Sequence, residues 1–143
     1  MNRQISTKRD ENSHWQNLFD PESVAVIGAS NTSGTWGFNI FWRVLNSGDR
    51  RVYPVNPSAS EVLGVKAFAR ITDIPEPVDL AVIVVKASQV PDTLQECIQK
   101  GVKAAEVISA GFAETGVSGT ELEAKIVGRW RLQRVSFHRL LML

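Results

Sequence analysis

The sequence predicts an α/β fold: a Rossmann-like parallel sheet with helices on both faces, in which the last strand is missing or atypical. Short apolar runs without polar alternation recur along the chain, as in strands that are buried on both faces. Segments with apolar residues at helical spacing separate these runs. The two kinds of segment alternate about every 25–30 residues, which is the pattern of repeated βαβ units.

Four strands are expected in turn. The first is predicted at residues 23–27 and the second at 51–55, where Pro54 disfavours a central place in the sheet because it has no N–H to donate. The third is predicted at 79–85, in the most apolar stretch of the chain, and the fourth at 104–109.

Helices are expected in three segments between and after these strands, at residues 35–48, 90–100 and 120–127. Gly48 and Gly101 are typical residues to end the first two, and Pro91 is typical of a first helical turn. Residues 58–62 are predicted as a short helix and 65–67 as a short strand.

Composition divides the chain into three parts. Residues 1–17 are polar and aperiodic, and we expect a flexible lead-in. Residues 18–127 are predicted as one domain. Residues 128–143 contain four arginines and no acidic residue, and two interpretations stay open. They form a divergent final strand at 134–137, or they are sequence read out of frame and ended early.

Charge and hydropathy exclude several classes of partner. The 16 Lys and Arg residues against 15 Asp and Glu leave a net charge of +1, without the excess that nucleic-acid binding favours. The longest apolar run, residues 80–85, is far shorter than the ~20 residues that span a bilayer. Residues 1–17 lack the apolar stretch of a secretory signal. We therefore expect a cytoplasmic protein with no nucleic-acid or membrane partner.

Cysteine and histidine usage predicts neither a disulfide nor a metal site. The single cysteine, Cys97, falls in a predicted helix and is expected to be an inert, half-buried thiol. No group of His, Cys and acidic residues has the spacing of metal ligands.

The segments after the strands are the candidates for chemistry, because ligands bind at the carboxyl ends of strands in such sheets. A glycine-rich segment, residues 28–37, leads into a helix N-terminus, whose N–H groups favour phosphate. Its spacing is neither that of the dinucleotide fingerprint nor that of a P-loop, although Gly34 and Gly37 keep the last G-x-x-G. Phosphate binding is favoured over a turn that serves only packing. Trp36 and Trp42 are expected in the helix core or on the cleft wall.

Residues 56–58 follow the second strand, where a dinucleotide-binding enzyme carries Asp or Glu for the ribose. Here an Asn-Pro pair contacts a ligand or simply turns the chain. Small residues follow the third and fourth strands at 85–87 and 109–111. Ser109 lacks a G-x-S-x-G frame and a partner histidine, so we assign no catalytic residue.

Several segments together carry a specific pattern. They are FDPESVAVIGAS at 19–30, GTWG at 34–37, VYPVNP at 52–57, EVLGVKA at 61–67, PVDLAVIVV at 77–85 and ISAGF at 108–112. The combination resembles the CoA-binding domain of NDP-forming (ADP-forming) acyl-CoA synthetases. The alpha subunit of succinyl-CoA synthetase is a more distant relative. The resemblance covers about residues 18–127.

The resemblance implies a Rossmann-like fold that holds CoA in extended form along the strand ends. By position, the phosphate loop would comprise Gly28, Ala29, Ser30, Gly34, Thr35 and Trp36. The nucleotide end would contact Asn56 and Pro57, and the pantetheine or adenine would lie beside Val85, Lys86 and Ala87. The far wall, near the thiol end, would comprise Ser109, Ala110, Gly111 and Phe112.

Three departures from the family pattern matter. Ser58 stands where relatives commonly have Lys, which removes a cation for the 3′-phosphate of CoA. Lys86 replaces the usual proline, and it supplies a different cation or only faces solvent. After Val127 the family's next strand and Gly-Pro-Asn turn are missing, and so are its phosphohistidine and ATP-grasp domains.

We therefore predict a CoA-binding domain, free-standing or the N-terminal part of such a ligase, that is not catalytically complete alone and works with ligase domains outside this chain. The alternative is an NAD(H)-binding Rossmann regulatory module, which the absence of an acidic residue at Asn56 disfavours. A complete small enzyme using Ser109 or Lys86 has no paired base or acid to support it. Residues 128–143 also predict self-association, because an incomplete sheet exposes a strand edge.

Overall fold

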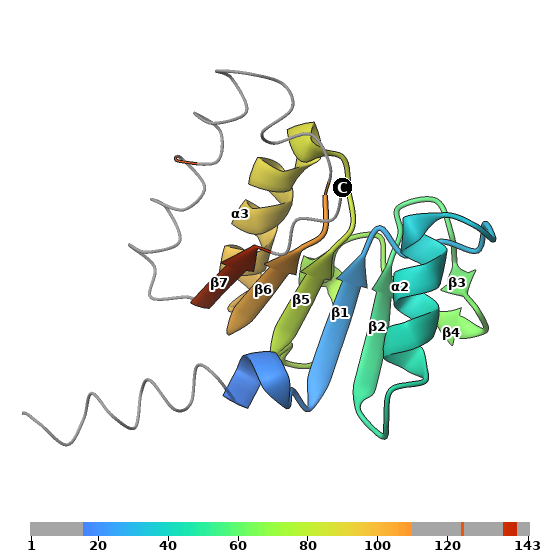
Figure 1. Cartoon of the computed structure of the whole chain (residues 1–143), viewed down its shortest axis with the longest axis horizontal. Coiled ribbons are helices and arrows are strands. Elements are labelled where there is room, and N and C mark those ends of the chain that lie inside the picture. Colours follow the sequence, from blue (N-terminus) through green and yellow to red (C-terminus); the bar gives the residue numbers. More distant parts are fainter. Residues whose placement is uncertain (1–15, 110–123, 125–135, 140–143) are drawn as a thin grey trace, which may run out of the picture.

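The computed structural model describes residues 16–109, 124 and 136–139. A turn of helix at residues 16–19 leads into the first strand (Figure 1). The lead-in predicted at 1–17 and the helix predicted at 120–127 lie almost wholly outside the described residues.

Five parallel strands form the main sheet, in the order β2-β1-β5-β6-β7. They are β1 (Ser23–Ile27), β2 (Arg51–Val55), β5 (Leu80–Ile83), β6 (Ala104–Val107) and β7 (Ser136–Arg139). The chain runs from β1 to β2 on one side and then returns to place β5 on the other side of β1 (Figure 1). This arrangement confirms the predicted α/β fold and puts a topological switch point between β1 and β5.

The strand bounds follow the prediction closely at β1 and β2, whereas β5 and β6 end two residues early. Val84 still donates to the carbonyl of Ile27 and Ile108 to that of Ile83, at 2.7 and 2.8 Å, and the backbone then leaves the sheet. Pro54 is tolerated in β2 because this strand lies at the edge of the main sheet.

A fifth strand, β7, follows β6 in the main sheet. β7 begins at Ser136, two residues later than predicted, and pairs in parallel with β6 through the register Ala104 with Ser136. The sheet therefore extends beyond β6.

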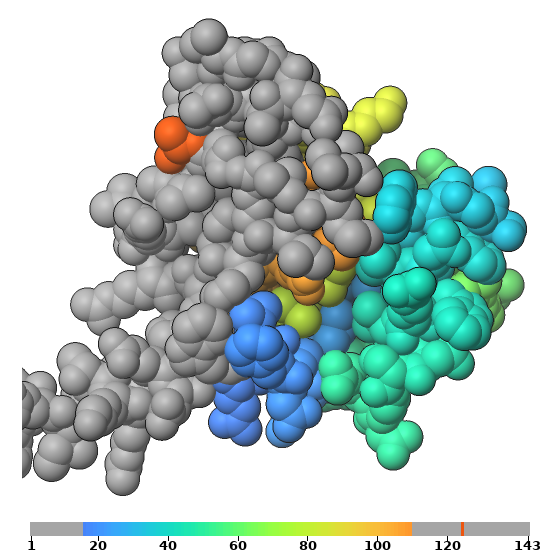
Figure 2. Space-filling view, viewed as in Figure 1, coloured from blue at the N-terminus to red at the C-terminus, as the bar shows by residue number. Residues whose placement is uncertain are grey.

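In the described part of the chain a helix covers each face of the sheet, which confirms the prediction of helices on both faces (Figure 1). On the first face, Phe41 of α2 (Trp36–Leu45) belongs to a buried cluster with Val24 and Val26 of β1. The space-filling view shows α2 over the right-hand part of this face (Figure 2). On the second face, Leu94 of α3 (Val90–Lys100) packs in a cluster with Ala25.

The helix ends agree with the predicted capping residues in part. The hydroxyl of Thr35 accepts a hydrogen bond from the N–H of Phe38 at 3.3 Å and so caps α2. This helix ends at Leu45, three residues before the expected stop. α3 has the predicted bounds, and Gly101 ends it in the left-handed conformation with φ +79°.

Residues 58–62 do not form the predicted short helix, and that prediction was wrong. β3 (Glu61–Val62) pairs antiparallel with β4 (Val65–Lys66), and the turn residues Leu63 and Gly64 have φ +48° and +78°. Two positive φ values are typical of a type I′ hairpin turn. Val62 is fully buried against the α2 side of the sheet, and this tertiary contact outweighs local helix propensity. Two short 3₁₀ turns, η1 (Ile71–Asp73) and η2 (Ala87–Gln89), complete the described elements.

Asp79 joins the amino-terminal ends of β1, β5 and β6 through hydrogen bonds. Its carboxylate accepts hydrogen bonds from the N–H of Glu22 at 3.0 Å and from the ammonium of Lys103 at 2.9 Å. Its own N–H donates to the hydroxyl of Ser23 at 2.9 Å. Burial opposes ionisation of this carboxyl, but the bonds from Lys103 and from the backbone outweigh it and lower the pKa of Asp79.

We expect Asp79→Asn to lower the free energy of unfolding at pH 7 by about 1–3 kcal/mol, because a buried charge-assisted contact is lost. The lowered pKa means that the carboxylate stabilises the fold above the unfolded-state pKa of about 3.9 and that this stabilisation is lost as the pH falls through the folded-state pKa. Urea unfolding from pH 7 to pH 2 should therefore show the two proteins converging in acid. The exposed Asp49→Asn serves as control. A difference that persists undiminished at pH 2 contradicts the assignment.

Candidate functional site

A cleft of about 900 Å³ opens at the carboxyl ends of the strands. Residues at or just after the ends of four strands line it: Ile27, Val55, Val84 and Ile108. It lies at the switch point between β1 and β5, where parallel α/β sheets bind ligands. Its volume is in the range of small-molecule and cofactor sites.

Most of the predicted site residues meet in this cleft. Those that line it are Gly28, Ser30, Thr35, Trp36, Pro57, Val85, Lys86 and Ser109. Four predicted residues within the described part of the chain are not in its lining: Ala29, Gly34, Asn56 and Ala87. The predictions for Ala110, Gly111 and Phe112 lie outside the described residues.

Two glycines let β1, β5 and α2 approach one another at the floor of the cleft. Gly28 has φ +93°, and a Cβ atom there would lie 2.0 Å from the carbonyl oxygen of Val84. A Cβ atom at Gly37 would lie 2.0 Å from the carbonyl oxygen of Gly28. Gly34 has φ +86°, but a Cβ atom there would meet nothing within 4 Å. Gly28 and Gly37 are therefore needed for packing, whatever else the loop does.

Two asparagines hold the loop between β1 and α2 in place. The amide of Asn56 donates to the carbonyl of Ala29 at 2.9 Å, and its oxygen accepts from the N–H of Ser58 at 2.8 Å. The amide of Asn31 donates to the carbonyl of Glu61 at 2.8 Å and accepts from the N–H of Leu63 at 2.9 Å. Asn56 therefore turns the chain and holds the loop in place. This is the structural one of the two roles considered for the Asn-Pro pair.

The loop presents the start of α2 to the cleft. Thr35 caps the N–H of Phe38. Trp36 and Gly37 are the first two residues of the helix, where backbone N–H groups have no intrahelical partner. Both residues line the cleft. The positive end of the helix dipole and these N–H groups favour a phosphate group at this position.

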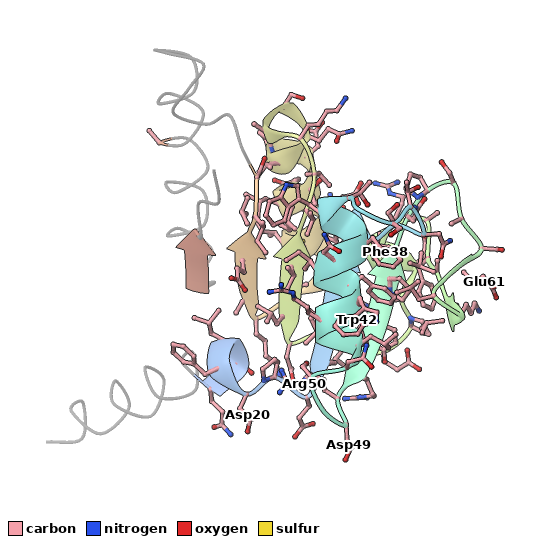
Figure 3. The ribbon with its side chains drawn as sticks, turned by 45° about the vertical axis from the view of Figure 1, so that its right-hand side comes forward. Asp20, Phe38, Trp42, Asp49, Arg50 and Glu61 are labelled. Atoms are coloured by element: carbon pink, nitrogen blue, oxygen red, sulfur yellow. The ribbon has the colours of Figure 1, made fainter. Side chains whose placement is uncertain are left out.

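The two tryptophans of α2 differ in place, although they are equally exposed at 54% and 53%. Trp36 lies in the wall of the cleft, which was one of its two predicted positions. Trp42 lies on the outer side of the helix, near Phe38 (Figure 3). It is neither in the core nor in the lining of the cleft, so that prediction was wrong for Trp42.

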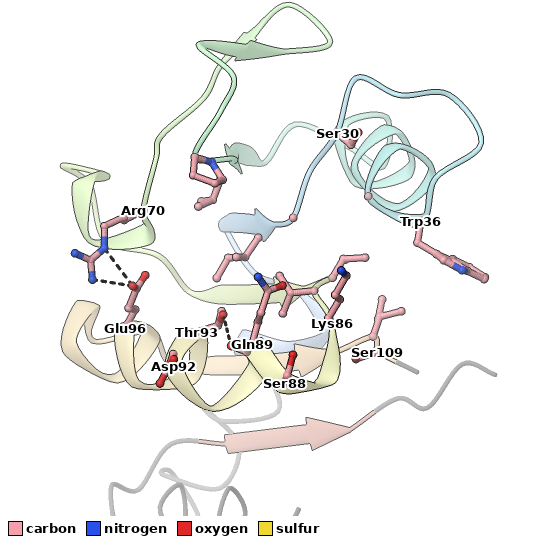
Figure 4. Close-up of a pocket in the computed structure, with 18 of the residues that line it drawn as sticks. Ser30, Trp36, Arg70, Lys86, Ser88, Gln89, Asp92, Thr93, Glu96 and Ser109 are labelled. Carbon is pink, nitrogen blue, oxygen red and sulfur yellow. Dashed lines mark hydrogen bonds and ion pairs between the residues drawn. The ribbon is translucent and has the colours of Figure 1, made fainter. Parts of the chain in front are cut away.

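Charged residues that the sequence did not single out complete the cleft. Arg70, which precedes η1, and Asp92 and Glu96 on α3 all line it (Figure 4). Arg70 donates through Nε at 3.1 Å and Nη2 at 2.7 Å to one carboxylate oxygen of Glu96. These residues belong to no motif. For Asp92 and Glu96 the signal was position alone, because the first turns of the helix after a strand also lie at the carboxyl edge of the sheet. Arg70 had no such signal.

The described residues contain no cluster of metal ligands, no reactive thiol and no membrane-spanning helix. Among the described residues, no group of three His, Cys, Asp or Glu side chains is placed to hold a metal ion. Cys97 is fully buried on the inner side of α3 rather than half-buried as expected. Burial raises its pKa to about 12, so the thiol stays protonated at neutral pH. No helix in the described part of the chain is long and apolar enough to cross a membrane.

Comparisons with known proteins agree on one family. The family model described as a CoA binding domain matches residues 22–125. The chain is 48% identical over 113 residues to acetate–CoA ligase [ADP-forming] II of Archaeoglobus fulgidus, covering 78% of this chain and 17% of the ligase. It is 46% identical to the alpha subunit of acetate–CoA ligase [ADP-forming] II of Pyrococcus furiosus, covering 77% of this chain and 24% of that subunit. The chain thus spans less than a quarter of these relatives' length.

Solved structures share the fold. A dinucleotide-forming acetyl-coenzyme A synthetase of Candidatus Korarchaeum cryptofilum, in complex with phosphate and ADP, superposes with a TM-score of 0.81 at 36% identity over 87% of this chain and 27% of that one. A conserved hypothetical protein from Pyrococcus furiosus has a TM-score of 0.68 at 24% identity, and the match covers 82% of this chain and 91% of that chain. The same fold therefore also occurs in a chain of comparable length.

Proposed function

The chain belongs to the family of CoA binding domains and is homologous to part of the ADP-forming acyl-CoA synthetases, and from this premise we propose that its cleft binds coenzyme A. The observation that carries the proposal is the cleft itself. It combines the switch point of the sheet, the start of α2 and a lining with both apolar and polar residues.

The diphosphate of CoA would bind at the start of α2. The N–H groups of Trp36 and Gly37 are the donors there, and the hydroxyl of Ser30 lines the same wall. The loop is already held by Asn31 and Asn56, so little conformational entropy is lost when a phosphate binds.

The rest of CoA would extend along the strand ends. In the sheet order, Pro57 follows the edge strand β2 and Ser109 follows β6, with the segments after β1 and β5 between them. The adenosine end would lie toward Pro57, and the pantetheine would pass Val85 and Ile108 toward Ser109. This orientation agrees with the assignment that the family resemblance implies.

The proposed role is that of the CoA-binding part of an acyl-CoA synthetase. The chain covers only 17% of the ligase from Archaeoglobus fulgidus, so the acyl and phosphoryl steps would depend on the other parts of such a ligase.

Calorimetric titration tests the proposal. We expect the chain to bind CoA saturably and more tightly than NAD, because Asn56 stands where ribose recognition in NAD enzymes requires an acid and its side chain is engaged with the loop. NAD binding that is equal or tighter overturns the proposal.

A matched pair of variants locates the site. Trp36→Ala should weaken CoA binding by about 1 kcal/mol or more, since the indole is part of the cleft wall. Trp42→Ala removes an equally exposed indole from the outer side of the same helix and should leave the affinity unchanged. Equal effects of the two variants would place CoA elsewhere.

A further inference from the structure

The described lining of the cleft contains four charged side chains whose signs balance. Arg70 and Lys86 are cationic, and Asp92 and Glu96 are acidic. These four side chains together therefore give an anionic ligand no net attraction. Recognition of phosphate groups depends on where the two cations stand.

Arg70 stands beside the end of β2. The N–H of Phe68 donates to the carbonyl of Pro54 at 3.0 Å, and the N–H of Asn56 donates to the carbonyl of Phe68 at 2.9 Å. The segment that leads to Arg70 thus runs along the outer edge of β2 and accompanies it to its carboxyl end. Arg70 then enters the lining of the cleft together with Pro57. Ser58, in the turn after β2, is exposed and uncharged.

The guanidinium of Arg70 is held in one orientation, but only some of its N–H groups are hydrogen-bonded to Glu96. Glu96 on α3 accepts both of its hydrogen bonds with a single oxygen, and the pair joins the segment before η1 to α3 at one end of the cleft (Figure 4). Of the five N–H groups of a guanidinium, three remain for another anion. The side chain of Arg70 is 59% exposed, so a ligand can reach them.

Lys86 stands at a different place. It follows β5, which lies two strands away from β2 in the sheet. The two cations therefore cannot serve one small phosphate group equally. CoA carries two separate anionic centres: a diphosphate, and a phosphate monoester on the ribose with close to two negative charges at neutral pH.

Resting on the proposal that the cleft binds CoA, we infer that Arg70 binds the 3′-phosphate and makes the site select CoA over dephospho-CoA. The guanidinium fork matches the geometry of a phosphate monoester, and a charge-assisted pair is stronger than a neutral one. Glu96 holds the fork in place in the free protein and repels the incoming phosphate. Lys86 contacts the part of the ligand that CoA and dephospho-CoA share.

Titration of CoA and dephospho-CoA into the same protein measures this selectivity. The wild-type chain should prefer CoA by about tenfold or more. Arg70→Ala should remove that preference by weakening CoA while leaving dephospho-CoA unchanged. Arg43→Ala removes an equal charge from an exposed position of α2 outside the cleft lining and should keep the preference. Melting curves should show all variants folded, since an exposed ion pair adds little stability.

Variants of the two neighbouring charged residues, Glu96 and Lys86, extend the test. Glu96→Gln should increase the preference for CoA, because the repulsion is removed, and Lys86→Ala should weaken both ligands by the same factor. A wild-type chain that binds both ligands equally overturns the inference while leaving CoA binding intact. A preference lost in Lys86→Ala but kept in Arg70→Ala also overturns it. Binding of neither ligand to the wild-type chain instead refutes the proposed function.

Discussion

Gly28→Ala should destabilise the fold by at least about 3 kcal/mol or prevent folding, the largest effect we expect from a single methyl group. The new Cβ atom would lie 2.0 Å from the carbonyl oxygen of Val84, which is backbone and cannot rotate away. The φ of +93° adds strain for any residue with a side chain. Urea unfolding followed by circular dichroism measures the loss.

Two further glycines separate the causes. Gly34→Ala has a similar φ of +86° but open space around the new atom, so it should show the backbone strain alone, about 1–2 kcal/mol. Gly37→Ala meets the carbonyl oxygen of Gly28 at 2.0 Å in a helix, where alanine is otherwise favoured by ~1 kcal/mol. It should therefore destabilise in spite of its propensity. If Gly37→Ala is stabilising, the close approach of α2 to β1 is wrong.

Phe41→Ala should lower the free energy of unfolding by about 3–5 kcal/mol, because it leaves a cavity between α2 and the sheet. Phe41 is 0% exposed and packs in the cluster that contains Val24 and Val26. Its neighbour Trp42 is 53% exposed on the outer side of the same helix, so Trp42→Ala should cost less than ~1 kcal/mol. Denaturant unfolding of both variants makes the comparison, and equal losses contradict the packing of α2.

Much of the fold was predictable because its strands are continuous apolar runs. β1 and β2 have their predicted bounds, and Pro91 and Gly101 bound α3 as expected. Such signals are local, and the residues that carry them are buried in the sheet or end a helix. The lining of the cleft was predictable in part, because residues that follow a strand in a parallel sheet lie at its carboxyl edge. Ala29, Gly34, Asn56 and Ala87 were predicted there and are not in the lining.

The errors occurred where a distant contact decides the structure. Residues 58–62 have a helix-like pattern, but pairing with β4 and burial of Val62 make them part of a hairpin. Arg70 has no motif around it, and only its pairing along β2 and with Glu96 on α3 brings it to the cleft. Trp42 follows the helical spacing of core residues and still faces outward.

The two asparagines that brace the loop after β1 join segments far apart in the chain. Asn31 bonds to residues 30 and 32 positions away, and Asn56 bonds to a carbonyl 27 positions away. A chain in which β2 and the β3–β4 hairpin have not yet docked therefore lacks the bonds that hold the loop between β1 and α2. The site exists only in the folded state, so a ligand that occupies it shifts the unfolding equilibrium by mass action. At a free ligand concentration of 100 times Kd this stabilisation is about 2.7 kcal/mol.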